Sequence, residues 1–176
     1  MTSVSADGDP VRKLNEKATL RGWAFVCERG PHFEAPKLVE VHALWESRSA
    51  PGKLPARAEF SARDLLRVLP VLMIAEIVRT DDRMRFRYRY VGTQMASTIG
   101  EMTGRFLDEV LPEPSLERTT ACYQATVDAR EPLRVVTRSS LNTVSYLSAE
   151  ILSAPLAGDG TTVDMLMTVT SFRTTP

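Results

Sequence analysis

The chain has 176 residues, of which 43% are hydrophobic and 25% charged, a composition typical of a single globular domain. Its 22 lysines and arginines balance 22 aspartates and glutamates, so the formal net charge is zero. A dedicated nucleic-acid binder normally carries a basic excess, and a membrane span needs an apolar run of ~18 residues; the sequence favours neither.

The N-terminal region is polar at first. Residues 1 to about 20 lack the apolar segment of a secretory signal and predict a loose tail. Residues 21–30 contain a short apolar stretch between glycines, which suits a small strand that packs on the body. We expect residues 1–36 to form a partly flexible N-terminal extension. Cys27 and Cys122 are too few for a disulfide framework, so we expect reduced thiols and a cytoplasmic location.

A leading amphipathic helix is predicted over residues 37–48. Leu38, Val41 and Trp45 recur near helical spacing and therefore share one side of this helix. His42 lies one residue away from the stripe, so we expect it on the flank or at the surface. The stripe also makes this helix our candidate interface with a partner or a second copy of the chain.

The most informative pattern is a strand pair, residues 71–80 and 83–92, whose second strand alternates arginine with apolar or aromatic side chains. A loop with an even number of residues sorts both strands into two faces. The inner face then pairs Met73 with Tyr90, Ala75 with Tyr88, and Ile77 with Phe86. The outer face pairs Glu76 with Arg87, flanked by Arg85 and Arg89. Single-strand binders need rings and cations on one surface, so this partition also argues against nucleic-acid binding.

Short helical segments surround this hairpin and follow it. They are predicted at residues 61–70, 93–102, 103–112 and 113–132. The expected N-caps are Ser61, with Asp64 completing a capping box, Thr103 and Ser115. In the last segment Leu116, Tyr123 and Val127 share one face. Gly92 and Gly104 are expected to serve turn geometry.

Three strand-like stretches end the chain, at residues 133–141, 144–156 and 161–172. Gly158-Asp159-Gly160 between the last two is a strong hairpin signal. Two groups of antiparallel strands separated by helices favour an α+β fold with one antiparallel sheet and helices gathered on one face.

This order resembles that of a PAS-type sensor domain, and more narrowly the bacterial PAS-like family five. The resemblance runs from about Leu38 to Phe172 and is carried by Trp45 and by residues 54–70, 86–95, 100–112 and 155–167. It implies a PAS-like five-stranded antiparallel sheet with helices packed on one face. Residues 1–36 lie outside the resemblance, and we expect them to include an N-terminal helical extension. The domain is expected over residues 37–174, including the leading helix 37–48. The resemblance implies detection of a signal or a partner, so no enzymatic activity is expected.

The apolar face of the predicted sheet is the candidate pocket. Methionine and aromatic side chains can adapt to a small apolar or aromatic ligand, and tyrosine hydroxyls can orient it. A filled core without a cavity is an equal alternative at this point. The candidate ligand-binding residues are Met73, Phe86, Tyr88, Tyr90, Met95, Tyr123, Met165 and Met167.

The sequence does not identify a cofactor, and it argues against flavin and haem. In light-sensing PAS domains a cysteine in a segment like NCRFLQ reacts with flavin, whereas TGRFLDE here has Gly104 at that place. Neither His32 nor His42 falls on the helices expected over the pocket, which a haem ligand would require. The spacing of Cys27, His32 and His42 matches no zinc motif, and Cys122 has no neighbouring base. No catalytic or metal-binding residue is therefore predicted.

Three functional hypotheses follow. The first is a stand-alone sensory or regulatory domain that binds a small organic ligand and signals to an unknown partner through protein–protein contacts. The second is a ligand-free interaction module of the same fold, which dimerises through Leu38, Val41 and Trp45. The third is a small enzyme that uses the pocket. Neither nucleic acid nor a membrane is expected as a partner.

Overall fold

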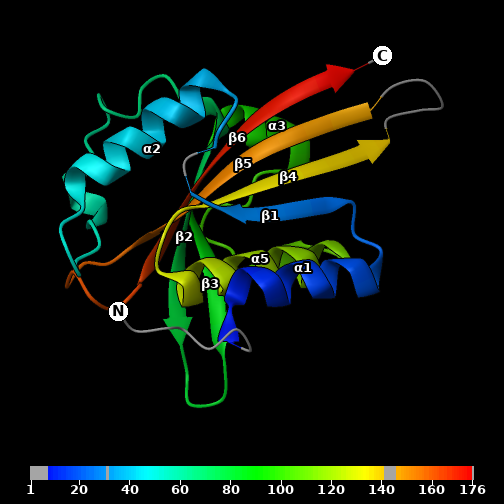
Figure 1. Cartoon of the computed structure of the whole chain (residues 1–176), viewed down its shortest axis with the longest axis horizontal. Coiled ribbons are helices and arrows are strands. Elements are labelled where there is room, and N and C mark those ends of the chain that lie inside the picture. Colours follow the sequence, from blue (N-terminus) through cyan, green and yellow to red (C-terminus); the bar gives the residue numbers. More distant parts are fainter. Residues whose placement is uncertain (1–7, 31, 141–145, 176) are drawn as a thin grey trace.

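Six antiparallel strands form one sheet in the order β1-β4-β5-β6-β2-β3 (Figure 1). The computed structural model describes residues 8–30, 32–140 and 146–175. The strands are β1 (Phe25–Arg29), β2 (Leu72–Arg79), β3 (Met84–Val91), β4 (Leu133–Ser140), β5 (Tyr146–Leu156) and β6 (Met165–Thr175). The helices are α1 (Pro10–Arg21), α2 (Pro36–Arg48), α3 (Thr93–Ile99), α4 (Leu107–Val110) and α5 (Ser115–Ala129), with 3-10 turns η2 (Arg57–Glu59) and η3 (Leu69–Val71).

The predicted α+β fold with one antiparallel sheet is confirmed, with one strand more than expected. The five predicted strands are β2 to β6; the ends predicted at residues 141 and 144–145 lie outside the described residues. The sixth is β1, the small strand predicted within residues 21–30, which pairs with β4 and extends the sheet at its edge.

The prediction of a loose tail is wrong for residues 10–21, which form α1, and the expected N-terminal helical extension is confirmed. The Asp9 side chain accepts a hydrogen bond from the Val11 amide (3.0 Å) and caps this helix. Val11, Leu14 and Ala18 recur at helical spacing and are buried. They pack in a small second core with Phe25, Cys27, Ala125, Leu133 and Val135. A buried stripe therefore fastens the N-terminal helix to β1, β4 and α5.

Helices cover both faces of the sheet, not one as predicted. On one face, Ser153 of β5 contacts α5 through its hydroxyl, 2.8 Å from the Thr126 hydroxyl. Its near neighbour Glu150 points to the opposite face, where it accepts hydrogen bonds from the Glu34 and Ala35 amides before α2. The Trp45 indole of α2 donates to the Pro155 carbonyl (2.9 Å) on that face. Figure 1 shows α2 apart from α1 and α5, which lie side by side.

The β2–β3 hairpin has the predicted register over most of its length. Ala75 pairs with Tyr88, Ile77 with Phe86 and Glu76 with Arg87. The register shifts between Ile74 and Ala75, so Met73 pairs with Val91 and Tyr90 pairs with Ile74. The predicted Met73–Tyr90 pair is therefore wrong, because a β-bulge adds one residue to β3. The bulge turns Tyr90 to the face opposite Tyr88, where its hydroxyl donates to the Leu69 carbonyl (3.1 Å).

The Phe86 and Tyr88 rings lie on the face opposite the Arg85 and Arg87 guanidinium groups, as the alternation predicts, whereas the bulge places Tyr90 on the arginine face. Phe86 and Tyr88 are 2% and 1% exposed. Arg87 donates to the Glu76 carboxylate (2.6 Å) on the other side of the sheet, as predicted. Arg85 instead pairs with Asp108 (2.6 Å), and its guanidinium stacks on the Phe106 ring at 3.7 Å, a contact the alternation does not predict.

The helix caps follow the sequence only in part. Ser61 and Asp64 make the reciprocal hydrogen bonds of a capping box (2.8 and 3.2 Å), but their segment continues as turns into η3 instead of an α-helix. Thr103 and Ser115 do not cap: α4 starts after Phe106, whose amide donates to Glu109, and Ser115 is already the first residue of α5. Helix α4 therefore begins later than its expected cap implied, and α5 begins one residue earlier.

Two glycines beside the hairpin have different roles. Gly104 has a φ of +83°, so the predicted turn geometry is confirmed there. Gly92 has an ordinary φ of −62°, but a Cβ atom on it would lie 2.2 Å from the Leu69 carbonyl oxygen and 2.5 Å from that of Pro70. Gly92 is therefore required by a close backbone approach and not by a turn.

Replacing Gly92 with alanine tests this close approach. We expect Gly92→Ala to lower the free energy of unfolding by about 1–3 kcal/mol, because η3 must move away from β3 to admit the methyl group. Chemical denaturation measures the change. Gly8→Ala is the matched control, since a Cβ there meets nothing within 4 Å. Equal stability of the two variants would contradict the packing described for Gly92.

Candidate ligand pocket

A cavity of about 350 Å³ lies between the sheet and helices α3 and α5. Small-molecule sites span roughly 300–1,000 Å³, so this volume is at the lower end of their range. Of the two alternatives that the sequence left open, the structure has a cavity on the apolar face and not a completely filled core.

Strand alternation builds the floor of the cavity. Residues two apart point to the same face of a sheet, so each strand contributes every second side chain. The floor residues of the two longest strands are Ala149, Ile151 and Ser153 from β5 and Thr168, Thr170 and Phe172 from β6. Apolar groups alternate here with small hydroxyls, which gives an apolar floor with a few hydrogen-bonding positions.

One face of α5 forms the opposite wall. The cavity-lining residues on this helix follow the spacing that places side chains along one helical face. They are Ser115, Arg118, Thr119, Cys122 and Tyr123. Helix α3 completes the wall with Met95, Thr98 and Ile99. Thr98 and Ile99 are exposed whereas Met95 is buried, so the cavity opens towards the end of α3.

Two phenols occupy the buried end of the cavity. Burial raises the pKa of Tyr88, and the neighbouring Tyr123 raises it further. Burial also raises the pKa of Tyr123, although side-chain hydrogen bonds with Thr168 and Tyr88 oppose that rise. Both hydroxyls therefore stay protonated at neutral pH, and each can donate and accept a hydrogen bond.

Four of the eight predicted pocket residues line the cavity: Met73, Tyr88, Met95 and Tyr123. Phe86 lies behind this wall, where its ring packs edge-on against Tyr123 with centroids 5.2 Å apart. The remaining predictions, Tyr90, Met165 and Met167, are corrected by the structure. In the sheet ladder Met165 pairs with Glu76, while Met167 and Tyr90 both pair with Ile74, and these pairs lie on the face opposite the cavity.

Arg118 and Cys122 also line the cavity, although neither was predicted there from the sequence. Helical spacing from Tyr123 was the available signal, because Arg118 and Cys122 fall on the same side of α5. Cys122 is a half-buried free thiol, as predicted, and burial raises its pKa to about 12. At neutral pH it is therefore protonated and is a poor nucleophile.

The two histidines lie away from the cavity. His32 is exposed, whereas His42 is 6% exposed and packs beside the Phe33 ring, so the predicted flank or surface position of His42 is wrong. Helix α2 buries it because this helix covers the far face of the sheet. Within the described ranges, no group of three His, Cys, Asp or Glu residues has an arrangement that could hold a metal ion.

The predicted interface residues are used inside the chain. Leu38, Val41 and Trp45 are 0%, 4% and 7% exposed and belong to the main core. Their helical stripe is real, but it packs on the chain's own sheet. These side chains are not available to a partner while α2 is in place.

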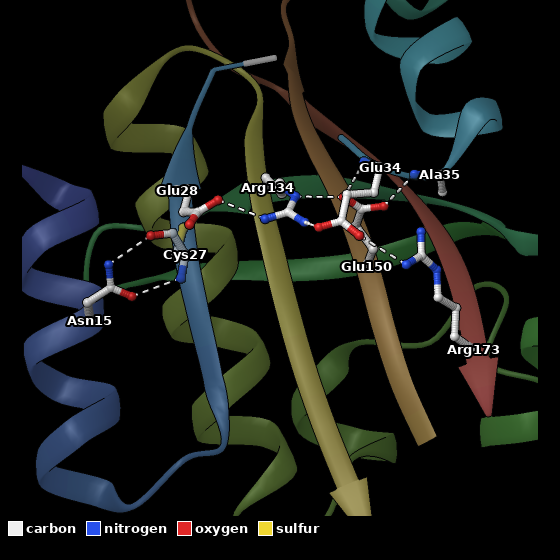
Figure 2. A network of polar contacts seen from close by, with 8 residues as sticks. All are labelled: Asn15, Cys27, Glu28, Glu34, Ala35, Arg134, Glu150 and Arg173. Carbon is white, nitrogen blue, oxygen red and sulfur yellow. Dashed lines mark hydrogen bonds and ion pairs between the residues drawn. The ribbon is translucent and has the colours of Figure 1, made fainter. Parts of the chain in front are cut away.

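A network of charged residues lies on the α2 face of the sheet, opposite the cavity (Figure 2). Arg134 donates to Glu150 (2.6 Å), Glu28 (2.8 Å) and Glu34 (3.2 Å), and Arg173 also contacts Glu34 (3.0 Å). Burial raises the pKa of Glu150. Hydrogen bonds from the Glu34 amide, Arg134 and the Ala35 amide outweigh this effect, so the pKa of Glu150 is lowered overall. Every member has a partner within the chain, so this network joins the segment before α2 to β1, β4, β5 and β6.

A continuous antiparallel sheet with a helix-covered cavity on one face is the architecture of PAS domains. A family model described as a PAS domain, the fifth PAS family, matches residues 33–170. The chain belongs to this family, which confirms the resemblance, and the match begins after α1 and β1.

Other comparisons are more distant. The chain is similar to a solved structure described as an RNA-binding light-oxygen-voltage receptor, with a TM-score of 0.40, 11% identity and coverage of 85% of this chain. It spans only 38% of that structure's chain. No curated protein matches the sequence. None of the helices in the described part of the chain is long and apolar enough to cross a membrane.

Glu150→Gln tests the charged network. Removing one charge of a buried pair leaves Arg134 poorly compensated, so we expect the free energy of unfolding to fall by roughly 3 kcal/mol in chemical denaturation. Glu40→Gln is the control, because it breaks the exposed Glu40–Arg67 pair and should cost less than about 1 kcal/mol. A similar small loss in both variants would refute a structural role for the network.

The same network predicts a pH dependence. Because the pKa of Glu150 is lower in the folded chain than the ordinary pKa of a glutamate, its contribution is fully present above that ordinary value. The contribution is lost as the pH falls through the folded-state pKa. Denaturation between about pH 5 and pH 3 should therefore show a smaller loss of stability in Glu150→Gln than in the unmodified protein. Parallel pH profiles would contradict the assignment.

Proposed function

We propose that the protein is a sensory or regulatory PAS domain that binds a small organic ligand in the cavity beneath α3 and α5. The observation that carries this proposal is the cavity itself, about 350 Å³ in volume and open at one end. Its apolar walls surround a few hydroxyl groups, a combination that is typical of sites for small organic molecules. Membership of the PAS family supports a regulatory role in general.

Helix α3 is the element through which we propose that binding reaches the surface. It has seven residues and is bounded by Gly92 and Gly100. Met95 reaches the cavity from its buried side, and Ile99 is 43% exposed at the opening. A ligand that covers Ile99 would hold the end of α3 against the sheet. Signalling to a partner would then follow from the changed position of α3, without any covalent step.

A binding role is better supported than a catalytic one. The lining residues include no histidine and no carboxylate, and burial raises the pKa of the Cys122 thiol to about 12. General acid–base catalysis needs a positioned group that titrates near neutral pH. We therefore propose that the cavity holds its ligand without turning it over.

The alternative of a ligand-free interaction module lacks an observed surface among the described residues. The predicted α2 stripe is buried, and both edges of the sheet are partly covered. Asn15 accepts from the Cys27 amide and donates to its carbonyl (both 2.8 Å), which shields part of the β1 edge. On β3, the Tyr88 amide donates to Arg105 and its carbonyl accepts from Gly104. These contacts leave less backbone free for pairing with a second chain.

Filling the cavity tests the proposal. Ala149 lies on the cavity floor and is 6% exposed, so Ala149→Leu places a larger side chain in the space a ligand would use. We use 1-decanol as a neutral apolar probe. At a concentration about a hundredfold above its Kd, binding to the folded state stabilises the protein by about 2.7 kcal/mol. We therefore expect 1-decanol to raise the melting temperature of the unmodified protein by several degrees. The shift should be lost in Ala149→Leu.

The control variant is Ala62→Leu, since Ala62 is exposed and does not line the cavity. It should respond to 1-decanol as the unmodified protein does. An equal thermal shift in Ala149→Leu, or no shift in any variant, would overturn the proposed function.

A further inference from the structure

The cavity wall carries a single charged side chain, that of Arg118, among the described residues that line it. Arg118 lies in the first half of α5 and is half-buried. Ser115 and Thr119 stand beside it on the same helical face, and all three are half-buried, whereas Tyr123 is buried. The described cavity wall therefore has one cationic position, flanked by two hydroxyls, in an otherwise uncharged lining.

Arg118 differs from the other buried or half-buried arginines whose side chains the structure describes. Each of the others has an oxygen partner within 2.6 to 2.9 Å: Arg57 with Phe60, Arg85 with Asp108, Arg87 with Glu76 and Arg134 with Glu150. The guanidinium of Arg118 has no ion pair or hydrogen bond within the described ranges. The neighbouring acid Glu117 instead contacts Lys17 (3.2 Å) and Arg21 (2.9 Å) on α1.

A partly desolvated cation without an anion is unfavourable, because burial removes water and returns no hydrogen bond. A carboxylate offers two coplanar oxygens that match the planar guanidinium in a bidentate pair. Bound at Arg118, it would also lie within the part of the wall that bears the Ser115 and Thr119 hydroxyls. The lack of an anionic partner for Arg118 and the planar shape of its guanidinium therefore both indicate a carboxylate.

The surroundings favour a monoanion over a phosphate. The first amides of α5 are already used: Leu116 donates to Pro112, Glu117 to Glu113 and Arg118 to Pro114. These three amides are therefore not free to bind a second anionic oxygen. For a dianion, the described cavity wall would provide one arginine to compensate two negative charges. A single carboxylate is matched by the single cation.

We propose that the ligand is an apolar carboxylate, bound with its carboxylate at Arg118 and its apolar part directed towards Met73 and Tyr88. This inference rests on the proposed function, since it names the class of ligand for the same cavity. A volume of about 350 Å³ is roughly that of twelve water molecules at ~30 Å³ each, which suits a chain of about ten carbons. Arg118 is the residue that selects acids over neutral molecules of equal length.

The test compares decanoate with 1-decanol and methyl decanoate by titration calorimetry at neutral pH. The unmodified protein should bind decanoate at least about tenfold more tightly than either neutral probe, as one charge-assisted pair contributes about that factor. Arg118→Gln should bind decanoate about tenfold more weakly and 1-decanol within about twofold of the unmodified protein. Arg118→Lys should recover part of the decanoate affinity, because it restores charge without the bidentate geometry.

Arg63→Gln is the matched control: it removes an exposed arginine that does not line the cavity, and decanoate affinity should stay unchanged. Equal affinity of the unmodified protein for decanoate and both neutral probes overturns the carboxylate inference and leaves the proposed function standing. This comparison holds even where Arg118→Gln fails to fold. Absence of binding by all three probes overturns the proposed function, and the inference with it.

Discussion

The alternation of side chains across one antiparallel sheet is the constraint on which the rest of the structure depends. In β5, Ile151 and Ser153 face the cavity while Glu150 and Leu152 face α2, and in β6 Thr168 faces the cavity while Met167 faces the other way. The same backbone thus supplies the floor of the cavity and one half of the main core. Shifting a strand by one residue would exchange these roles, so the pocket is only as well defined as the sheet register.

The register is held from both sides of the sheet. On the α2 face, Arg134 of β4 and Glu150 of β5 pair across neighbouring strands, and the same Glu150 carboxylate binds the backbone before α2. On the cavity face, Thr126 of α5 contacts Ser153. Helix α3 has no comparable polar tie to the sheet in the contacts described, and it borders the opening of the cavity. The domain therefore combines a firmly connected frame with one short helix next to the cavity.

The sequence predicted those features that follow from simple periodicity. The β2–β3 pairing around Ala75 and Tyr88 was predictable because only one register separates rings from arginines. The bulge before Tyr90 was not, since the arginine–aromatic alternation continues through it unbroken. Met165 and Met167 were assigned to the wrong face because β6 is buried on both sides, so polarity does not distinguish them from Thr168 and Thr170. Arg118 was missed because its significance depends on the lack of a partner, which only the fold reveals.

Methyl NMR of the methionines tests the central claim most directly, because these residues sample both faces of the sheet. Met73 and Met95 line the cavity, whereas Met165 and Met167 lie on the opposite face. Titration of the ¹³C-methyl-labelled protein with decanoate should shift the Met73 and Met95 resonances and leave those of Met165 and Met167 in place. Shifts confined to Met165 and Met167, or none at all, would contradict a ligand pocket between the sheet and helices α3 and α5.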